Sequence, residues 1–213
     1  MISRNLIILD VETSGLDPHD GCEIVELYAK AINFTDLQPH HAGTFHALIK
    51  PETPEKAQAK ALEVIGPLWA KANNEGLQRK AALKQFLTWC ERVNDKGAKS
   101  MMTKPIFIAY NKDFDSMFMR AELIRNELIK KSKFGWEVPW GFEFDAMGFA
   151  YLMFENDPLV SDLKLNTILN RCGMSRDVSD LHSAKEDVEL TAEWLVRLLQ
   201  FCREARKRMK ISE

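Results

Sequence analysis

An apolar segment that ends in two carboxylates dominates the start of this sequence. Residues 6–12 read Leu-Ile-Ile-Leu-Asp-Val-Glu, and such an apolar run is typical of a buried strand. Because side chains alternate across a strand, Asp10 and Glu12 leave the same face. Adjacent carboxylates raise each other's pKa unless a cation lies between them, and hard oxygen ligands of this kind suit Mg²⁺ or Mn²⁺. The alternative is a strand that simply finishes in polar residues.

Length and charge narrow the class of protein. A chain of 213 residues is long enough to bury the core of one α/β domain, and we expect residues 1–213 to form a single domain. The 29 Lys and Arg residues against 31 Asp and Glu give a net charge of −2 and a pI near 6.2. The molecule has no net positive charge that would attract polyanions, so any nucleic-acid binding must depend on a local part of its surface.

The cysteines argue against disulfides and structural zinc. Cys22, Cys90, Cys172 and Cys202 are scattered, with no CxxC pair and no His at zinc-ligand spacing. This usage is typical of reduced thiols in the cytoplasm. No stretch approaches the ~20 apolar residues that a membrane span needs. We therefore expect a soluble, cytoplasmic protein without a membrane partner.

Hydrophobic periodicity predicts strands first, then alternating helices and strands. The first three strands, at 5–11, 23–33 and 43–50, suit a meander. The later elements are a strand at 105–110, helices at 55–64, 77–94, 114–124, 163–171 and 184–206, and loops at 97–104 and 134–142. This order predicts an α/β fold with a mixed sheet covered by helices.

A second acidic element lies where an apolar strand gives way to a helix, in Phe107-Ile108-Ala109-Tyr110-Asn111-Lys112-Asp113-Phe114-Asp115. Such a junction lies at the edge of the sheet where open α/β folds gather their ligands. Asp115 is therefore expected to reach the first pair, while Asp113 is the better candidate for a plain N-cap. Two capping acids remain the alternative.

The third element is Leu181-His182-Ser183-Ala184-Lys185-Glu186-Asp187. Ser183 and Glu186 have the spacing of a capping box, which makes Ser183 the N-cap of a helix that starts at Ala184. His182 and Asp187 then occupy the two positions that meet in a hydrophobic staple, so an imidazole lies beside a carboxylate at a helix N-terminus. A capping box with incidental polar neighbours is the alternative. The remaining histidines, with no such partner, are expected at the surface: His19, His40, His41 and His46.

Taken in order, the three elements resemble the exonuclease motifs of the DEDDh family, which includes the proofreading subunit of bacterial replicative DNA polymerase, RNase T and oligoribonuclease. The motifs are Asp10-x-Glu12, Asn111-x-x-Phe114-Asp115 and His182-x4-Asp187. The turn at residues 13–16, the strand at 23–27 and the strand-to-helix element at Phe144-Asp145 extend the resemblance along nearly the whole chain. It implies an RNase H-like fold with a five-stranded mixed sheet and 3′ to 5′ removal of nucleotides from single-stranded ends.

The resemblance also implies roles for individual residues. Two Mg²⁺ or Mn²⁺ ions would be held by four carboxylates, Asp10, Glu12, Asp115 and Asp187, and clamp the attacking and leaving oxygens. His182 would take a proton from the attacking water, because a base that titrates near neutral pH is efficient. Leu16 matches the position that wedges against the terminal base. Three further residues match the contacts to the last nucleotide: Thr13, Asn111 and Phe114.

Two departures from the family pattern concern the nucleotide pocket. Tyr110-Asn111 stands where His-Asn is common, and Ile65-Gly66-Pro67 where many members have His-Gly-Ile.

Three hypotheses about function remain. They are a single-strand exonuclease with DNA favoured, an oligoribonuclease-like or RNase T-like enzyme acting on RNA, and a catalytically silent RNase H-like binding module. A silent module is expected to lose at least one of the five site residues, and none is missing. The sequence leaves open the oligomeric state, including a homodimer, and any polymerase or other protein partner.

Overall fold

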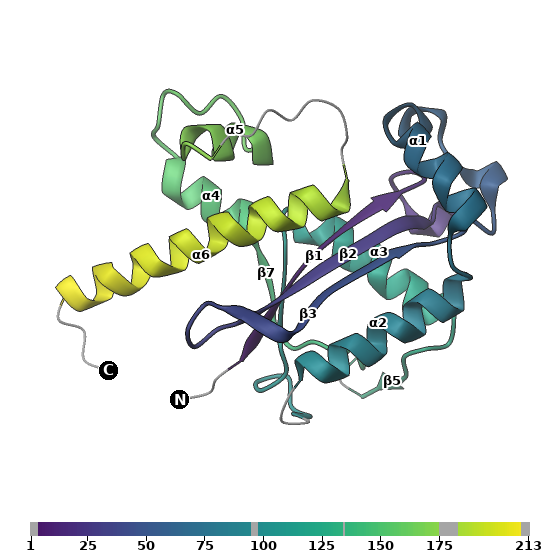
Figure 1. Cartoon of the computed structure of the whole chain (residues 1–213), viewed down its shortest axis with the longest axis horizontal. Helices are drawn as coiled ribbons and strands as arrows, with labels where there is room; N and C mark the ends of the chain where they lie inside the picture. Colours follow the sequence, from purple (N-terminus) through teal and green to yellow (C-terminus); the bar gives the residue numbers. More distant parts are fainter. Residues whose placement is uncertain (1–3, 95–97, 134, 175–182, 210–213) are drawn as a thin grey trace.

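A five-stranded mixed sheet forms the centre of the computed structural model, which describes residues 4–94, 98–133, 135–174 and 183–209 (Figure 1). Its order is β3-β2-β1-β4-β7. The strands are β1 (Asn5–Thr13), β2 (Ile24–Asn33), β3 (Pro39–Leu48), β4 (Ile106–Ala109) and β7 (Glu143–Asp145). The first three form an antiparallel meander, whereas β4 runs parallel to β1 and β7 parallel to β4. The predicted meander and mixed sheet are confirmed.

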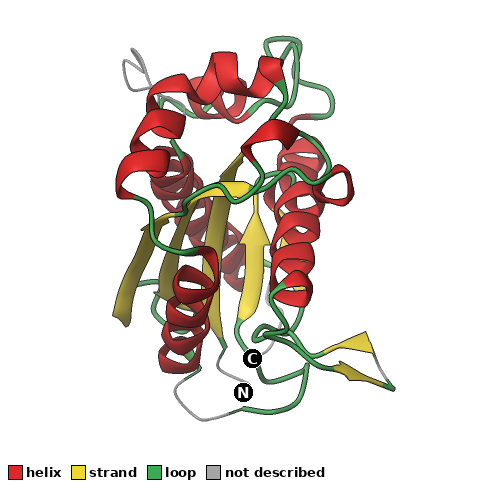
Figure 2. Ribbon diagram, turned by 90° about the vertical axis from the view of Figure 1, so that its right-hand side faces the viewer, coloured by secondary structure: helices red, strands yellow, loops and turns green. Residues whose placement is uncertain are grey.

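Helices cover both faces of this sheet, as Figure 2 shows. One face carries α2 (Arg79–Val93) and α3 (Lys112–Arg125), and the other carries α4 (Ala146–Phe154), α5 (Leu165–Arg171) and α6 (Ala184–Arg208). Successive side chains of β1 point to opposite faces of the sheet, so they pack in two separate parts of the core. Ile7 and Leu9 pack with α2 and α3, while Leu6 and Ile8 pack with the other layer. No helix among the described residues is long and apolar enough to cross a membrane.

Three predicted boundaries were wrong. The helix expected at 55–64 is α1 (Ala59–Glu75), which continues past Pro67 because its backbone is kinked at Ile65. The departing Ile65-Gly66-Pro67 segment therefore lies within a helix. β3 begins at Pro39 rather than at 43. The expected loop at 134–142 contains β6 (Gly135–Trp136), which pairs with β5 (Lys131–Ser132).

A buried ion-pair cluster joins α2 to the sheet and to α3. Arg79, the first residue of α2, is fully buried. Its Nη1 donates to Glu122 Oε1 on α3 at 2.9 Å, and its Nη2 lies 3.1 Å from Oε1 of Glu23, the residue before β2. Glu23 Oε2 also accepts from the backbone N–H groups of Glu52 and Thr53. The cluster fixes the elements that surround the C-terminal end of β1.

Candidate active site

The first pair of carboxylates leaves β1 on the face that α6 covers. In the pairing of β1 with β2, Asp10 lies opposite Tyr28 and Glu12 opposite Glu26. The register of this pairing shifts after Glu12, where the strand approaches its end. Both side chains are half-buried, because they lie where the apolar strand passes under the first turn of α6. The expectation that Asp10 and Glu12 share one face is confirmed.

Asp115 approaches β1 from the first turn of α3. It is 2% exposed, and its Oδ1 accepts a hydrogen bond from the backbone N–H of Val11, between the two carboxylates of β1, at 3.1 Å. The parallel pairing of β4 with β1 explains this approach, since the chain leaves β4 at the same sheet edge at which β1 ends. Asp115 is thus tied to the backbone of the first pair.

Asp113 is not the N-cap of α3, so that prediction was wrong. The helix begins at Lys112, with Asn111 as its N-cap in the left-handed region at φ 65°. Asn can adopt this conformation more readily than most residues, which starts the helix two residues earlier than expected. Asp145 Oδ1 supplies the acceptor for the Asn111 N–H at 3.0 Å. Asp113 is exposed and forms an ion pair with Lys112.

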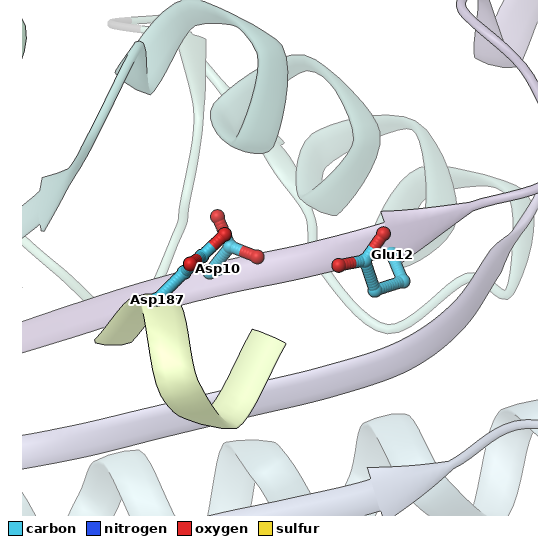
Figure 3. Close-up of side chains that lie close together, drawn as sticks. All are labelled: Asp10, Glu12 and Asp187. Atoms are coloured by element: carbon cyan, nitrogen blue, oxygen red, sulfur yellow. The ribbon is translucent and has the colours of Figure 1, made fainter. Parts of the chain in front are cut away.

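Asp187 completes the cluster from the first turn of α6. Ser183 is the N-cap, and its side chain accepts from the Glu186 N–H at 3.3 Å, as the capping box predicted. Asp187 then points toward Asp10 on β1, with Glu12 further along the same strand (Figure 3). One carboxylate oxygen from each of these three residues lies within 4.8 Å of the others.

Burial and like charge dominate the electrostatics of this cluster. Burial, together with the charges of Asp187 and Glu26, raises the pKa of Glu12 from 4.5 to about 7. The pKa of Asp115 is raised by burial, although the hydrogen bond from Val11 opposes this. Burial also raises the pKa of Asp10 well above its usual value, as do four neighbouring carboxylates, in decreasing order Asp115, Asp187, Glu12 and Glu26.

This donor set fits divalent cations with hard oxygen preference. Oxygen atoms of three carboxylates lie within 4.8 Å of one another, and Asp115 is tied to the backbone between two of them. Such oxygen ligands suit Mg²⁺ and Mn²⁺, whose charge removes the repulsion that raises the carboxyl pKa values. Asp10, Glu12 and Asp187 could therefore hold a divalent cation, and Asp115 is held against the backbone beside them.

The other predicted site residues are placed differently. Leu16 is 72% exposed on a loop that is fixed by two hydrogen bonds, from the Leu16 N–H to Gln58 Oε1 and from the Gln58 N–H to the Ser14 carbonyl. Asn111 is exposed at the start of α3, and Phe114 packs against Phe118 with ring centroids 5.0 Å apart. Thr13 is buried, and its hydroxyl donates to the Gly15 carbonyl. His182 lies outside the described residues.

Two features near the site were missed by sequence reasoning. Glu26 is 4% exposed on β2 and accepts a hydrogen bond from the Ala184 N–H, the first amide of α6, at 3.0 Å. His46, expected at the surface without a partner, is exposed but pairs with Glu26 at 2.7 Å. Apart from the Glu residue within an apolar strand, the sequence carries no local signal for these two contacts of Glu26.

His40 was also expected at the surface, and this prediction was wrong. His40 is 5% exposed, and its ring accepts a hydrogen bond from the Ala42 N–H.

Comparison with known proteins decides the family. The sequence matches the RNase T family model, described as Exonuclease, over residues 7–195. The chain belongs to this exonuclease family. The predicted membership of an exonuclease family is confirmed, and one solved neighbour, the nuclease domain of 3′hExo, is itself named a DEDDh family member.

Two curated relatives match over most of this exonuclease chain. Ribonuclease T of Buchnera aphidicola subsp. Baizongia pistaciae is 26% identical over 202 residues, which cover 91% of this chain and 82% of that protein. DNA polymerase III subunit epsilon of Rickettsia prowazekii is 28% identical over 198 residues, which cover 93% of this chain and 75% of the relative.

Solved structures support the same fold for this exonuclease. E. coli exonuclease I in complex with a dT13 oligonucleotide superposes with a TM-score of 0.70 at 15% identity, over 92% of this chain. The chain spans only 41% of the length of that protein. The nuclease domain of 3′hExo, a DEDDh family member bound to rAMP, gives a TM-score of 0.66 at 20% identity over 93% of this chain and 92% of that domain. These likenesses confirm the RNase H-like fold.

Proposed function

We propose that this protein is a metal-dependent 3′–5′ exonuclease that hydrolyses the terminal phosphodiester of single-stranded nucleic acid and releases nucleoside 5′-monophosphates. The observation that carries the proposal is the convergence of carboxylates from β1 and α6 within 4.8 Å, with Asp115 of α3 bonded to the backbone between two of them. Three elements distant in sequence thus contribute like charges to one place. This arrangement is unfavourable for a metal-free fold and suits a metal-dependent one.

The proposed mechanism assigns the four carboxylates to the cations. Asp10, Glu12, Asp115 and Asp187 would hold two Mg²⁺ or Mn²⁺ ions, which would supply Lewis acidity for hydrolysis of the phosphodiester. His182 accepts the proton of the attacking water, because an imidazole has a pKa of about 6.5 and works efficiently close to neutral pH. Ser183 supports this role, since it starts α6 directly after His182.

The proposed substrate contacts lie around the loop that follows β1. Leu16 wedges against the terminal base, and its exposed side chain on a hydrogen-bonded loop is suited to that contact. Asn111 is exposed and Phe114 half-buried at the start of α3, where they contact the last nucleotide. Thr13 is buried and supports the loop through its hydrogen bond to Gly15. Its contribution to the nucleotide pocket is therefore through the backbone that it orders.

Single-stranded DNA is the favoured substrate, and RNA is the alternative. The similarity to ribonuclease T keeps an RNA exonuclease, including an oligoribonuclease-like one, as the second candidate. The similarity to a polymerase subunit makes a polymerase a candidate partner for a DNA enzyme. A catalytically silent binding module is disfavoured, because it gains nothing from a cluster of mutually repelling carboxylates.

The proposal extends to the whole chain and its surroundings. We expect residues 1–213 to act as one exonuclease domain, of which the family model covers 7–195. All four cysteines are free, which supports a reducing compartment such as the cytoplasm. Both a monomer and a homodimer are compatible with a site built from one chain.

The test compares matched end-labelled DNA and RNA oligonucleotides, with Mg²⁺, with Mn²⁺ and with chelator. We expect metal-dependent shortening from the 3′ end, with single-stranded DNA degraded fastest and nucleoside 5′-monophosphates as products. Asp187→Asn is the control that separates this activity from a contaminating nuclease. Release of label first from the 5′ end, or equal activity of Asp187→Asn, would contradict the proposal. Faster degradation of RNA would favour the second candidate.

A further inference from the structure

A buried carboxylate on β2 contacts the first amide of the helix that carries Asp187. Glu26 is 4% exposed, and each of its carboxylate oxygens has a hydrogen-bond partner. Oε2 accepts from the Ala184 N–H at 3.0 Å, and Oε1 lies 2.7 Å from Nε2 of His46 on β3. Because both oxygens are engaged by different elements, the carboxylate has a single orientation. Glu26 therefore links two strands of the sheet to the N-terminus of α6.

The negative charge of Glu26 adds to the repulsion among the carboxylates of the site. Glu26 lies opposite Glu12 in the pairing of β1 with β2, and its charge raises the pKa of both Glu12 and Asp10. A neutral side chain at this position would relieve that repulsion. The hydrogen bond to Ala184 gives a reason for an acceptor here, since the first amides of a helix have no partners within the helix and favour negative charge.

Helix geometry relates the Ala184 contact to the position of Asp187. The two residues are three positions apart, so they lie within one turn and about 4.5 Å apart along the helix axis. Ser183 already accepts from the Glu186 N–H, which makes this turn well ordered. A hydrogen bond that holds the Ala184 amide against β2 therefore sets how far α6 lies along the sheet and how its first turn is rotated.

We propose that Glu26 is a positioning residue, which ties the first turn of α6 to β2 so that Asp187 meets Asp10 and Glu12, and that His46 orients Glu26 for this contact. This inference rests on the proposed metal-dependent function. In this role Glu26 contacts neither the metal nor the substrate. Glu26 affects the reaction only because it places Asp187.

Two substitutions at position 26 separate the hydrogen bond from the charge. Glu26→Ala removes both, whereas Glu26→Gln removes the charge and keeps an oxygen that can accept from Ala184. Loss of a residue that orients a metal ligand typically weakens metal binding 10- to 100-fold, and we expect a loss of about that size for Mn²⁺ with Glu26→Ala. Glu26→Gln is expected to lose less than about threefold, because the acceptor remains.

The direct measurement is Mn²⁺ affinity by calorimetric titration, together with hydrogen exchange of the Ala184 amide in metal-free protein. We expect faster exchange and weaker Mn²⁺ binding in Glu26→Ala, with thermal unfolding used to confirm that the variant is folded. In the exonuclease assay kcat should fall while KM for the oligonucleotide stays within about twofold, since only the metal ligand is displaced. Equal losses in Glu26→Ala and Glu26→Gln would overturn the proposal, because the charge alone would then matter.

Glu189→Ala is the matched control. Glu189 also links β2 to α6, by accepting from Tyr28 Oη at 2.8 Å and pairing with Lys30, but it does so without contacting the first amide of the helix. We expect this variant to bind Mn²⁺ like the wild type. A loss as large as that of Glu26→Ala would overturn the proposal, since any contact between β2 and α6 would then suffice.

His46→Ala carries the test if Glu26→Ala does not fold. The substitution removes the partner of Glu26 Oε1. We expect it to weaken Mn²⁺ binding roughly two- to fivefold, because His46 acts on the metal site only through Glu26. Wild-type Mn²⁺ affinity in this variant, with unchanged exchange at Ala184, would refute the assigned role. An inactive wild-type protein that binds Mn²⁺ would refute the proposed function alone, because the titration and the exchange measurement do not depend on nuclease activity.

Discussion

Replacing Glu12 by Gln should stabilise the metal-free protein at neutral to alkaline pH. Folding raises the pKa of Glu12 from 4.5 to about 7, so the folded state retains a proton that the unfolded state releases. The stabilising contribution of the protonated form is fully present below about pH 4.5 and is lost as pH rises through about 7. An amide of the same shape carries no charge and avoids that loss.

The size of the effect follows from the two pKa values. At about 1.4 kcal/mol per pKa unit, the rise from 4.5 to about 7 corresponds to about 3.5 kcal/mol of lost stability above pH 7. Glu12 is half-buried, so solvent screening lowers the value that will be measured. We therefore expect Glu12→Gln to unfold with a free energy about 2 to 3 kcal/mol higher than the wild type at about pH 8 in chelator.

Urea unfolding followed by circular dichroism measures this difference. Near pH 4 the wild type and Glu12→Gln should have the same stability, since the wild-type carboxyl is then protonated in both states. Saturating Mn²⁺ should reverse the order at about pH 8, because the wild type binds the ion more tightly. Asp113→Asn, a change at an exposed acid, is the control and should leave stability within about 0.5 kcal/mol. A Glu12→Gln protein less stable than the wild type in chelator at about pH 8 would refute the electrostatic argument.

The other predictions concern the second motif, the general base and the buried arginine. Asp115→Asn should lose nearly all exonuclease activity with an unchanged far-ultraviolet spectrum, whereas Asp113→Asn stays active because its side chain is exposed; the reverse result would mean that the wrong acid had been chosen. His182→Ala should lower kcat about 10²- to 10⁴-fold and keep Mn²⁺ affinity, as measured by single-turnover kinetics and titration; wild-type kinetics would exclude His182 as the base. Arg79→Ala should lower the free energy of unfolding by about 3 to 5 kcal/mol, because Glu122 stays buried without its main partner; a loss below about 1 kcal/mol in urea unfolding would contradict this.

The sheet and the acidic cluster follow largely from sequence patterns. The run at 6–12 has the alternation that puts Asp10 and Glu12 on one face, and the Ser183 spacing places the start of α6 at the correct residue. These features are set by neighbours in sequence, so their signals are local. For the same reason the order of the first three strands could be predicted from their spacing along the chain.

Other features depend on contacts between distant segments. The partners of Glu26 lie 20 and 158 positions away, and no neighbouring residue indicates that this carboxylate is engaged. The start of α3 was missed because it depends on the left-handed backbone of Asn111 and an acceptor from Asp145, 34 residues later. α1 extends beyond its expected end because a kink at Ile65 makes Pro67 tolerable.

The hydrogen bonds of Asp145 couple the edge strand of the sheet to two helices. A single oxygen, Oδ1, accepts from the Asn111 N–H before α3 and from the Met147 N–H in α4, each at 3.0 Å. β7 is only three residues long, and a strand this short could otherwise shear along β4 at little cost. Any such slip would break both hydrogen bonds at once, so the edge strand is tied to the helix that carries Asp115. Local opening of this edge and displacement of Asp115 are thereby parts of one cooperative event.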